Sequence, residues 1–506
     1  MGITSALEKL DQVIARSAFP KIVSERGEIS KVNAARIAVG VIMLYRTALI
    51  VAATYYYHPT DVTEAQVTTK FMLGCGMLLV LSAYTVGVCT PLAGLVLIAA
   101  YPYFDARLLT GTLGTNIASL CMITLLLLNT GSRYSVDAQV LQRRGVIGSL
   151  WRRMYRVIGS PNAAQTARIY FLAFTAYAVI SFSALVYHVN DEYWREGRTV
   201  GIMLTSAYLT PFYEVFRSLE SAIPTLYRLS SAACVIGQSI FQVAMLPLIF
   251  LVWGRRFVAA WGLMFFTISL VCLQLSYLPY LELVLWALIF VRTRSQSAVE
   301  PTQEQAQHPT IAAAYTGVIA VAFVLFLITW FAPGGRAWSG NAWDKPQRAL
   351  AWVGLDAPQV FNEADLKMGE RWPVIHRVVA TGERILVPLN GKDGERLAYH
   401  RSDLLYFGNS LRWHRRMIAS DPSVYNRPGE TGHEQIREVC YYDYAREHLT
   451  EPVLYEVSVY QNRSASPHVP TDERYIAQPI LSFNVEIVSG GSQPEYRHPR
   501  EGGDPV

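Results

Sequence analysis

Long apolar runs fill the first two-thirds of the chain, and polar positions dominate the last third. Leu, Ile, Val, Ala and Phe form runs at approximately 34–57, 70–90, 91–109, 112–130, 167–188, 231–253, 257–275, 277–292 and 310–331. A helix needs about 20 apolar residues to cross the hydrocarbon core of a bilayer. The pattern therefore predicts a polytopic α-helical membrane bundle over residues 33–331 with about nine spans. The run 277–292 is short enough to be tilted, partly buried or re-entrant.

A polar stretch, residues 1–32, precedes the first span. Ser5 and Glu8 have capping-box spacing, and Leu7, Leu10 and Ile14 then fall on one helical face. The stretch predicts a cytoplasmic helix lying on the membrane surface. Since no apolar run lies near residue 1, we expect no cleavable signal peptide, and the first span then serves as the targeting signal.

The polar region 333–506 has the pattern of a mixed α+β domain. Short β-type runs at 374–380, 383–389 and 395–400 are separated by turn sequences, which predicts a three-stranded meander. A helix is predicted from Thr431 to about Leu449, because Thr431 and Glu434 have capping-box spacing. Two further strands are predicted at 453–461 and 479–488.

Composition supports a membrane protein and argues against several other classes. Hydrophobic residues make up 52% and charged residues 16% of the 506 positions, whereas about 25% is the charged share of soluble domains. The net charge of +5 is not gathered into a basic stripe, so no nucleic-acid partner is expected. Six cysteines form no CxxC, and only Cys440 lies in the polar region. A disulfide within that region and a cysteine-based metal site are therefore excluded.

Loop charges predict the orientation of the chain. The loop 131–166 contains six arginines against the single acid Asp137, and further arginine pairs follow the sixth and eighth runs. Cytoplasmic loops retain positive charge. We therefore expect the N-terminus and the loop 131–166 in the cytoplasm, and residues 333–506 outside it.

One segment of the basic loop has helical amphipathic spacing. Its apolar positions are Ile147, Leu150, Trp151, Met154, Tyr155 and Ile158, and arginines occupy the other face. This pattern is typical of a helix lying on an anionic inner leaflet. A helix buried between spans is the alternative.

Ionisable and amide side chains are costly inside membrane spans, so each is expected to have a bonding partner or a functional role. Arg36 lies near enough to the inner surface to snorkel, whereas Arg46 is about ten helical rises further along and is expected to face the bundle interior. Arg46 either pairs with an oxygen that fixes helix packing or binds an anion. Glu282 is either a functional acid or a packing partner for an arginine such as Arg46. Gln242, with Gln238 one turn away, either bridges helices or contacts substrate.

The end of the fifth run gathers the most polar chemistry. Tyr187 and His188 are followed by Asn190, Asp191, Glu192 and Trp194 at the expected outer interface. His188 is a candidate proton carrier at neutral pH. The plain alternative is a solvated helix end beside a tryptophan of the aromatic belt.

Three segments carry a resemblance to a known family: residues 131–138 (GSRYSVDA), the stretch from Ala167-Arg168 to the Trp194–Gly197 motif, and residues 241–290. They resemble the horizontally transferred transmembrane (HTTM) family, the bacterial relatives of vitamin K-dependent gamma-carboxylase. The family motif residues are Arg133, Ser135, Asp137, Arg168 and Gly197. The resemblance covers roughly residues 30–295 and implies a multi-pass protein of the bacterial inner membrane.

The departures from the family pattern bear on activity. Family members commonly have a lysine where this chain has His188, a glutamate where it has Gln242, and a histidine where it has Phe265 or Phe266. The resemblance implies a cavity lined by His188, Trp194 and Glu282, open to the extracytoplasmic side.

Two functions follow from this resemblance, and one further class is weaker. The first is a non-catalytic or divergent membrane component that acts with a protein or peptide partner at the extracytoplasmic face, surrounded by lipid. The second is a carboxylase-like enzyme that uses a quinone-type cofactor on a secreted peptide. The missing lysine, glutamate and histidine favour the first. A solute transporter is weaker, because no inverted repeat is visible.

Overall fold

The computed structural model describes residues 25–56, 64–107, most of 113–291, 371–387, most of 426–461 and 478–488. The chain divides into two compact units. The helical unit consists of Met1–Ala48, Gly76–Leu204 and Ala222–Glu363, and the sheet unit consists of Leu49–Cys75, Thr205–Ser221 and Ala364–Val506. The N-terminal surface helix predicted at 5–19 lies outside the described residues.

The described part of the chain begins with long apolar helices. They are α2 (Glu25–Tyr56), α3 (Glu64–Val86), α4 (Thr90–Arg107) and α5 (Leu113–Leu127). Gly87 ends α3 with a φ of +82°, which glycine adopts without steric penalty. Pro91 then occupies the first turn of α4. N–H groups there have no acceptor within the helix, so the missing N–H of proline costs no hydrogen bond. These two residues explain why the apolar stretch 70–109 breaks into two helices.

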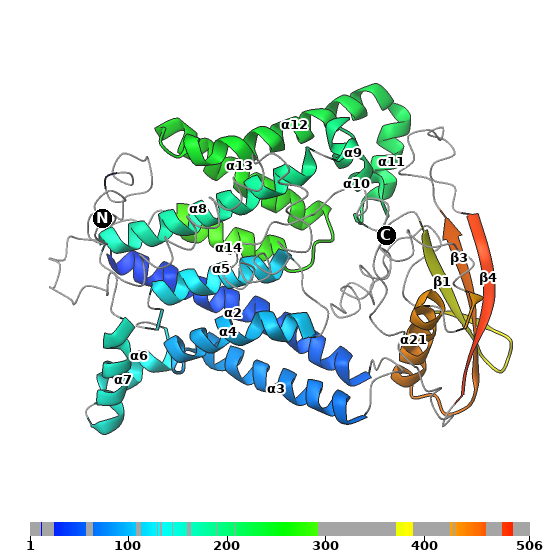
Figure 1. Cartoon of the computed structure of the whole chain (residues 1–506), viewed down its shortest axis with the longest axis horizontal. Helices are drawn as coiled ribbons and strands as arrows, with labels where there is room; N and C mark the ends of the chain where they lie inside the picture. Colours follow the sequence, from blue (N-terminus) through cyan, green and yellow to red (C-terminus); the bar gives the residue numbers. More distant parts are fainter. Residues whose placement is uncertain are drawn as a thin grey trace, which may run out of the picture. The chain divides into compact units, whose positions relative to one another are not determined.

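The next helices along the chain are one long helix and several short ones. They are α6 (Val136–Gln142), α7 (Val146–Ile158), α8 (Ala163–His188), α9 (Glu192–Arg195), α10 (Thr199–Thr205) and α11 (Tyr213–Ala222). In Figure 1, α6 and α7 lie at one end of α3 and α4, and α7 runs across their direction. The amphipathic pattern of the loop 131–166 thus forms the predicted helix.

The last described helices of the helical unit are apolar: α12 (Pro224–Leu248), α13 (Val252–Cys272) and α14 (Leu278–Phe290). α14 has 13 residues, which is about 20 Å of helix and less than the thickness of the hydrocarbon core. It packs against α5, α8 and α13, and Leu281, Leu285 and Ile289 are buried. Of the alternatives for 277–292, the structure shows a short and partly buried helix.

Among the described residues, five helices are long and apolar enough to cross a membrane: Glu28–Val51, Thr68–Val86, Gln165–Leu185, Pro224–Leu248 and Val252–Cys272. Three more predicted runs form shorter apolar helices, Thr90–Phe104, Gly114–Leu127 and Leu278–Phe290. The run 310–331 lies outside the described residues. A multi-pass membrane protein therefore fits the structure, and the figure of nine spans stays a prediction.

A small antiparallel sheet forms the described core of the sheet unit. Its strands are β1 (Arg371–Val378), β2 (Arg384–Leu386), β3 (Val453–Gln461) and β4 (Gln478–Ile487), in the order β2-β1-β3-β4. The predicted hairpin at 374–389 is confirmed, with Gly382 at a φ of +82° in its turn. The strands predicted at 453–461 and 479–488 are confirmed as β3 and β4. The predicted strand 395–400 lies outside the described residues.

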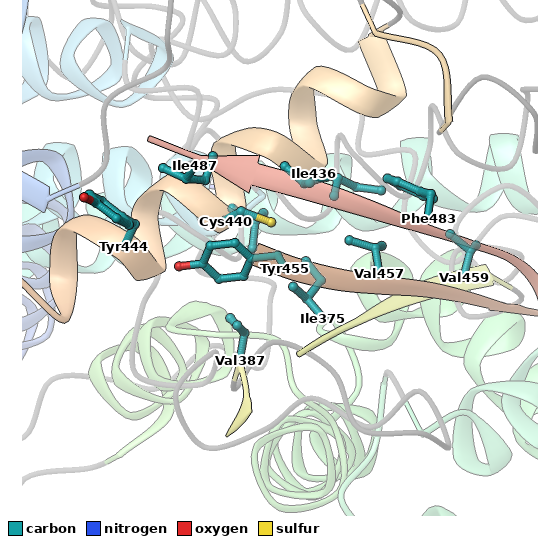
Figure 2. Packing of buried hydrophobic residues seen from close by; sticks show 12 residues of the cluster. Ile375, Val387, Ile436, Cys440, Tyr444, Tyr455, Val457, Val459, Phe483 and Ile487 are labelled. Carbon is teal, nitrogen blue, oxygen red and sulfur yellow. The ribbon is translucent and has the colours of Figure 1, made fainter. Parts of the chain in front are cut away.

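One helix covers one face of this sheet. It is α21 (Thr431–Arg446), which begins at the residue where the capping-box spacing predicts a start. Ile436 and Cys440 of α21 meet alternate side chains of β3, including Tyr455 and Val457 (Figure 2). The alternation follows from the pleat, which turns every second side chain to the same face. Phe483 of β4 joins the same core.

A buried ion pair lies beside this core. Arg377 of β1 donates from a terminal guanidinium nitrogen to Asp443 Oδ2 of α21 at 2.9 Å, and the Tyr455 hydroxyl donates to the same oxygen at 3.0 Å. Glu447 lies 3.8 Å from the guanidinium. Burial raises the pKa of Asp443 more than Arg377 and Tyr455 lower it. The pair joins the helix to two strands of the sheet.

Candidate functional site

The end of α8 holds the histidine that the sequence singles out. His188 is the last residue of α8 and is buried. Its ring stacks on the Trp194 ring, with centroids 3.9 Å apart and planes at 20°. Asp191 caps α9 by accepting a hydrogen bond from the Trp194 amide at 3.1 Å. The structure therefore brings His188 and Trp194 together, and the solvated-helix-end interpretation of His188 is wrong because the tryptophan covers it.

The segment after Trp194 is fixed to α12. The Trp194 indole N–H donates to Ser239 Oγ at 3.0 Å, and Ser231 Oγ donates to the Gly197 carbonyl at 2.6 Å. Gly197 has a φ of +71°, and a Cβ there would lie 2.8 Å from the Ala232 Cα. Only glycine fits both the conformation and the contact. Gly197 thus lets the chain approach α12 closely enough to hold Trp194 against His188.

Glu282 lies deeper in the helical unit. The buried Glu282 accepts a hydrogen bond from the Tyr177 hydroxyl of α8 at 2.8 Å. Phe266 and Trp286 pack around Tyr177, with ring centroids 5.8 and 5.5 Å from its own. Tyr177 precedes His188 by three helical turns, about 16 Å along α8. The described contacts therefore place Glu282 with Tyr177, and a cavity shared with His188 stays a prediction.

Arg46 occupies a second buried polar cluster. It is 2% exposed and donates to the Tyr101 hydroxyl of α4 at 2.6 Å. Its guanidinium also lies 4.1 Å from the centroid of the Tyr277 ring, a cation–π distance. The Tyr277 hydroxyl is 2.9 Å from Thr115 Oγ1 of α5. The prediction that Arg46 is buried and has an oxygen partner is confirmed, and that oxygen belongs to a tyrosine.

The two glutamines have different surroundings. Gln238 accepts from the Trp261 indole at 3.4 Å and so connects α12 to α13, which is the bridging alternative. Gln242 is buried, and its Oε1 has no hydrogen-bond partner among the described residues. Phe266, one of the two phenylalanines that the resemblance sets against a histidine, packs edge-to-face on Trp286 with ring centroids 5.2 Å apart. Hydrophobic packing thus surrounds Phe266.

The GSRYSVDA motif forms a buried junction around Asp137. Its carboxylate accepts five hydrogen bonds, from Cys89 N, Thr90 N, Thr90 Oγ1, Trp151 Nε1 and Tyr155 Oη, at 2.6–2.8 Å. Burial alone would raise the pKa of Asp137, but the hydrogen bonds led by Tyr155 and Thr90 lower it below its usual value. We call this set of contacts the Asp137 junction. It joins the start of α4 to α6 and α7.

Arg36 supports the same junction from α2. Its terminal nitrogens donate to the carbonyls of Tyr84, Thr85 and Tyr134 at 2.5–2.9 Å. The snorkelling predicted for Arg36 is wrong, because the guanidinium is fully buried and binds the last carbonyls of α3, which lack partners within the helix.

Of the remaining motif residues, Ser135 caps a helix, Arg168 lies on α8, and Arg133 is not among the described residues. Ser135 caps α6, accepting from Ala138 N at 3.0 Å and donating to the Gly131 carbonyl at 2.5 Å. Arg168 is partly exposed on α8. Arg133 lies outside the described residues, and so does the side chain of Tyr187. Among the described residues, no group of three or more His, Cys, Asp or Glu is placed to hold a metal ion.

Sequence reasoning missed the tyrosines. Tyr101, Tyr177 and Tyr277 are the partners of the interior charges, and all three lie in or beside apolar runs. A buried tyrosine hydroxyl usually finds a hydrogen-bond partner. Tyrosines inside the other apolar runs were therefore the available signal for the partners of Arg46 and Glu282. No family model, curated protein or solved structure matches the chain.

Proposed function

We propose that the chain is an HTTM-like, multi-pass membrane protein that acts as a non-catalytic component with a protein or peptide partner at the extracytoplasmic face. Its apolar helices are those of an integral membrane protein. The proposal extends this to a scaffold whose sheet unit receives the partner outside the cytoplasm, as the loop charges predict.

One observation supports the proposal most: the buried candidate residues Glu282 and Arg46 are bound by tyrosines of the same helical unit. Glu282 is engaged by Tyr177, and Arg46 by Tyr101 and Tyr277. Each contact joins two helices. Such pairs fix helix packing in an apolar surrounding, where an unpaired charge is costly. A general base for carboxylation would instead need to be available to substrate.

The sheet supplies a surface for the partner. β4 lies at the edge of the described sheet, and among the described residues its outer edge has no paired strand. Ser482, Asn484 and Glu486 of β4 are exposed, while Phe483 and Val485 turn toward α21. An edge with a polar outer face suits an added strand, which contributes main-chain hydrogen bonds.

Photo-cross-linking in native membranes tests this proposal. A photoreactive residue at Asn484 or Glu486 should give an adduct with one predominant protein or peptide. The same residue at Ser458 of the inner strand β3 is the matched control and should give much less. Equal adducts from β3 and β4, or adducts with lipid alone, would contradict the proposal.

The alternative is a carboxylase-like enzyme using a quinone-type cofactor. The buried Glu282 and the His188–Trp194 stack are the groups that would handle protons in such a reaction. Both are already engaged, Glu282 by a tyrosine and His188 by an aromatic face. The described residues therefore fit packing better than base chemistry. A mass gain of one carboxyl group on the cross-linked peptide, lost in His188→Ala, would instead favour the enzyme.

A further inference from the structure

We propose that α7 is a binding element for anionic phospholipids, held by the Asp137 junction with its apolar face in the bilayer surface. The observation behind it is an exposed apolar face on a helix whose opposite face is fixed to the protein. Val146, Ile147 and Leu150 are 85%, 65% and 60% exposed. They lie within one 100° sector of the helix, which is the width of a membrane-binding stripe.

The opposite face of α7 fixes its rotation. The Trp151 indole and the Tyr155 hydroxyl both donate to Asp137, at 2.7 and 2.6 Å. Gly148 is buried, and a Cβ there would lie 2.1 Å from the Arg143 carbonyl. Because these three positions face the protein, α7 presents Val146, Ile147 and Leu150 outward.

The positive charge near the outward face of α7 favours anionic lipid as its ligand. Arg153 is exposed beside the apolar stripe, Arg143 is exposed at the end of α6, and the sequence 138–158 contains no acidic residue. Arg152, on the side of α7 away from the stripe, donates to the carbonyls of Leu141 and Arg143 at 2.9 and 3.0 Å and so caps the end of α6. Arginines beside an apolar stripe match phosphate headgroups above acyl chains.

Position makes a bilayer the surface available to α7. Asp137 is tied to the backbone of Cys89 and Thr90, where α3 ends and α4 begins. α7 therefore lies level with the ends of apolar helices, and it crosses their direction in Figure 1. A helix at that level and angle lies along a membrane surface. A cytosolic protein docking on the same face is the rival outcome of the test.

Spin labels on the reconstituted full-length protein test the inserted face. The background has serine at the four cysteines that are not buried, Cys75, Cys89, Cys234 and Cys272. Labels at Val146 and Leu150 should collide with oxygen more than with an aqueous nickel complex in vesicles containing phosphatidylglycerol. A label at Ser149 should show the reverse. Aqueous exposure at Leu150 in those vesicles would overturn the proposal.

A charge variant tests the selectivity. Arg143→Gln with Arg153→Gln should shift the Leu150 label from bilayer to water about 30-fold, since each arginine near an anionic surface contributes about fivefold. Arg255→Gln with Arg256→Gln, which removes the same charge at the start of α13, is the matched control and should leave the label unmoved. Equal shifts in both variants would overturn selective binding.

A second control separates helix amphipathicity from charge. Val215 of α11 is also exposed on an amphipathic helix, but Glu214 lies beside it. A label at Val215 should not respond to replacement of phosphatidylcholine by phosphatidylglycerol. If the Leu150 label is shielded from both reagents in native membranes but not in vesicles, the face binds a protein and the lipid proposal fails.

Discussion

The two compact units stabilise a buried aspartate in different ways. In the helical unit, Asp137 receives five hydrogen bonds from uncharged donors. In the sheet unit, Asp443 faces the charged Arg377 and one tyrosine. The pKa of Asp137 is lowered and that of Asp443 is raised. At Asp137 the hydrogen bonds outweigh burial, whereas at Asp443 burial, together with the nearby Glu447 carboxylate, outweighs Arg377 and Tyr455.

The two sites differ in the charge of their hydrogen-bond donors. Neutral dipoles stabilise a charge without requiring a second buried charge, whose desolvation would cost further free energy. The buried cation Arg36 is likewise stabilised by neutral groups, since it donates to three backbone carbonyls. In the helical unit, both signs of charge therefore serve to join chain segments.

The largest expected effect is the loss of the Asp137 carboxylate. Asp137→Ala leaves the amides of Cys89 and Thr90 and the hydroxyl of Tyr155 without their acceptor. Each buried unsatisfied donor costs about 1–3 kcal/mol, so we expect a loss of about 4 kcal/mol or more. Hydrogen exchange of the α6 and α7 amides measures it. Asp137→Asn keeps the shape and should lose less; protection of α7 unchanged in both variants would contradict the junction.

A double-mutant cycle sharpens the contrast between the two aspartates. Arg377→Ala and Asp443→Ala should show a coupling energy of about 2 kcal/mol, because each leaves a buried charge without its partner. Arg36→Ala and Asp137→Ala should couple by less than about 1 kcal/mol, because their hydrogen bonds go to different groups. Hydrogen exchange in each unit gives both cycles. Equal coupling would remove the distinction.

Two glycines with similar backbone angles should respond differently. Gly197→Ala meets both a φ of +71° and the Ala232 backbone, and should lose about 2 kcal/mol and loosen the His188–Trp194 stack. Gly382→Ala in the β1–β2 turn has a φ of +82° but open space, and should lose about 1 kcal/mol. Thermal unfolding of each variant measures the losses. A greater loss at Gly382 would contradict the close approach at Gly197.

The smallest expected effect is a pH response of opposite sign in the two units. The lowered pKa of Asp137 contributes stability that is present above its unfolded value of about 4 and is lost as the pH falls through the folded value. The raised pKa of Asp443 contributes stability below about 4 that is lost as the pH rises through the folded value. Hydrogen exchange against pH in Asp137→Asn and Asp443→Asn should each remove one slope. Slopes of the same sign would contradict the comparison.

The sequence predicted most elements where local pattern determines them. β3 and β4 follow from alternating apolar positions, α21 from its capping spacing, and α7 from helical amphipathicity. Among the described residues, the runs 91–109 and 112–130 contain the shorter apolar helices Thr90–Phe104 and Gly114–Leu127. Hydropathy predicted that these helices exist, but it did not predict their lengths.

The candidate site was predictable only in part. The burial of Arg46 followed from its depth in an apolar run, but its pairing with Tyr101 joins residues 55 positions apart. Arg36 was expected to snorkel to the inner surface, and the last turn of α3 and the backbone at Tyr134 instead bring carbonyls to it. Glu282 and His188 were expected at one cavity, yet the described partner of Glu282 is Tyr177. Contacts between spans depend on helix rotation, which apolar periodicity leaves open when a helix is apolar all round.

The central claim is that the interior charges hold the bundle and perform no chemistry on the partner. Glu282→Gln tests it most directly, because a glutamine carbonyl still accepts from Tyr177 while the carboxylate is gone. We predict that the partner adduct formed from Asn484 of β4 keeps its wild-type yield and mass in this variant. An adduct of unchanged yield that loses a covalent modification present in the wild type would contradict the account and make Glu282 a catalytic residue.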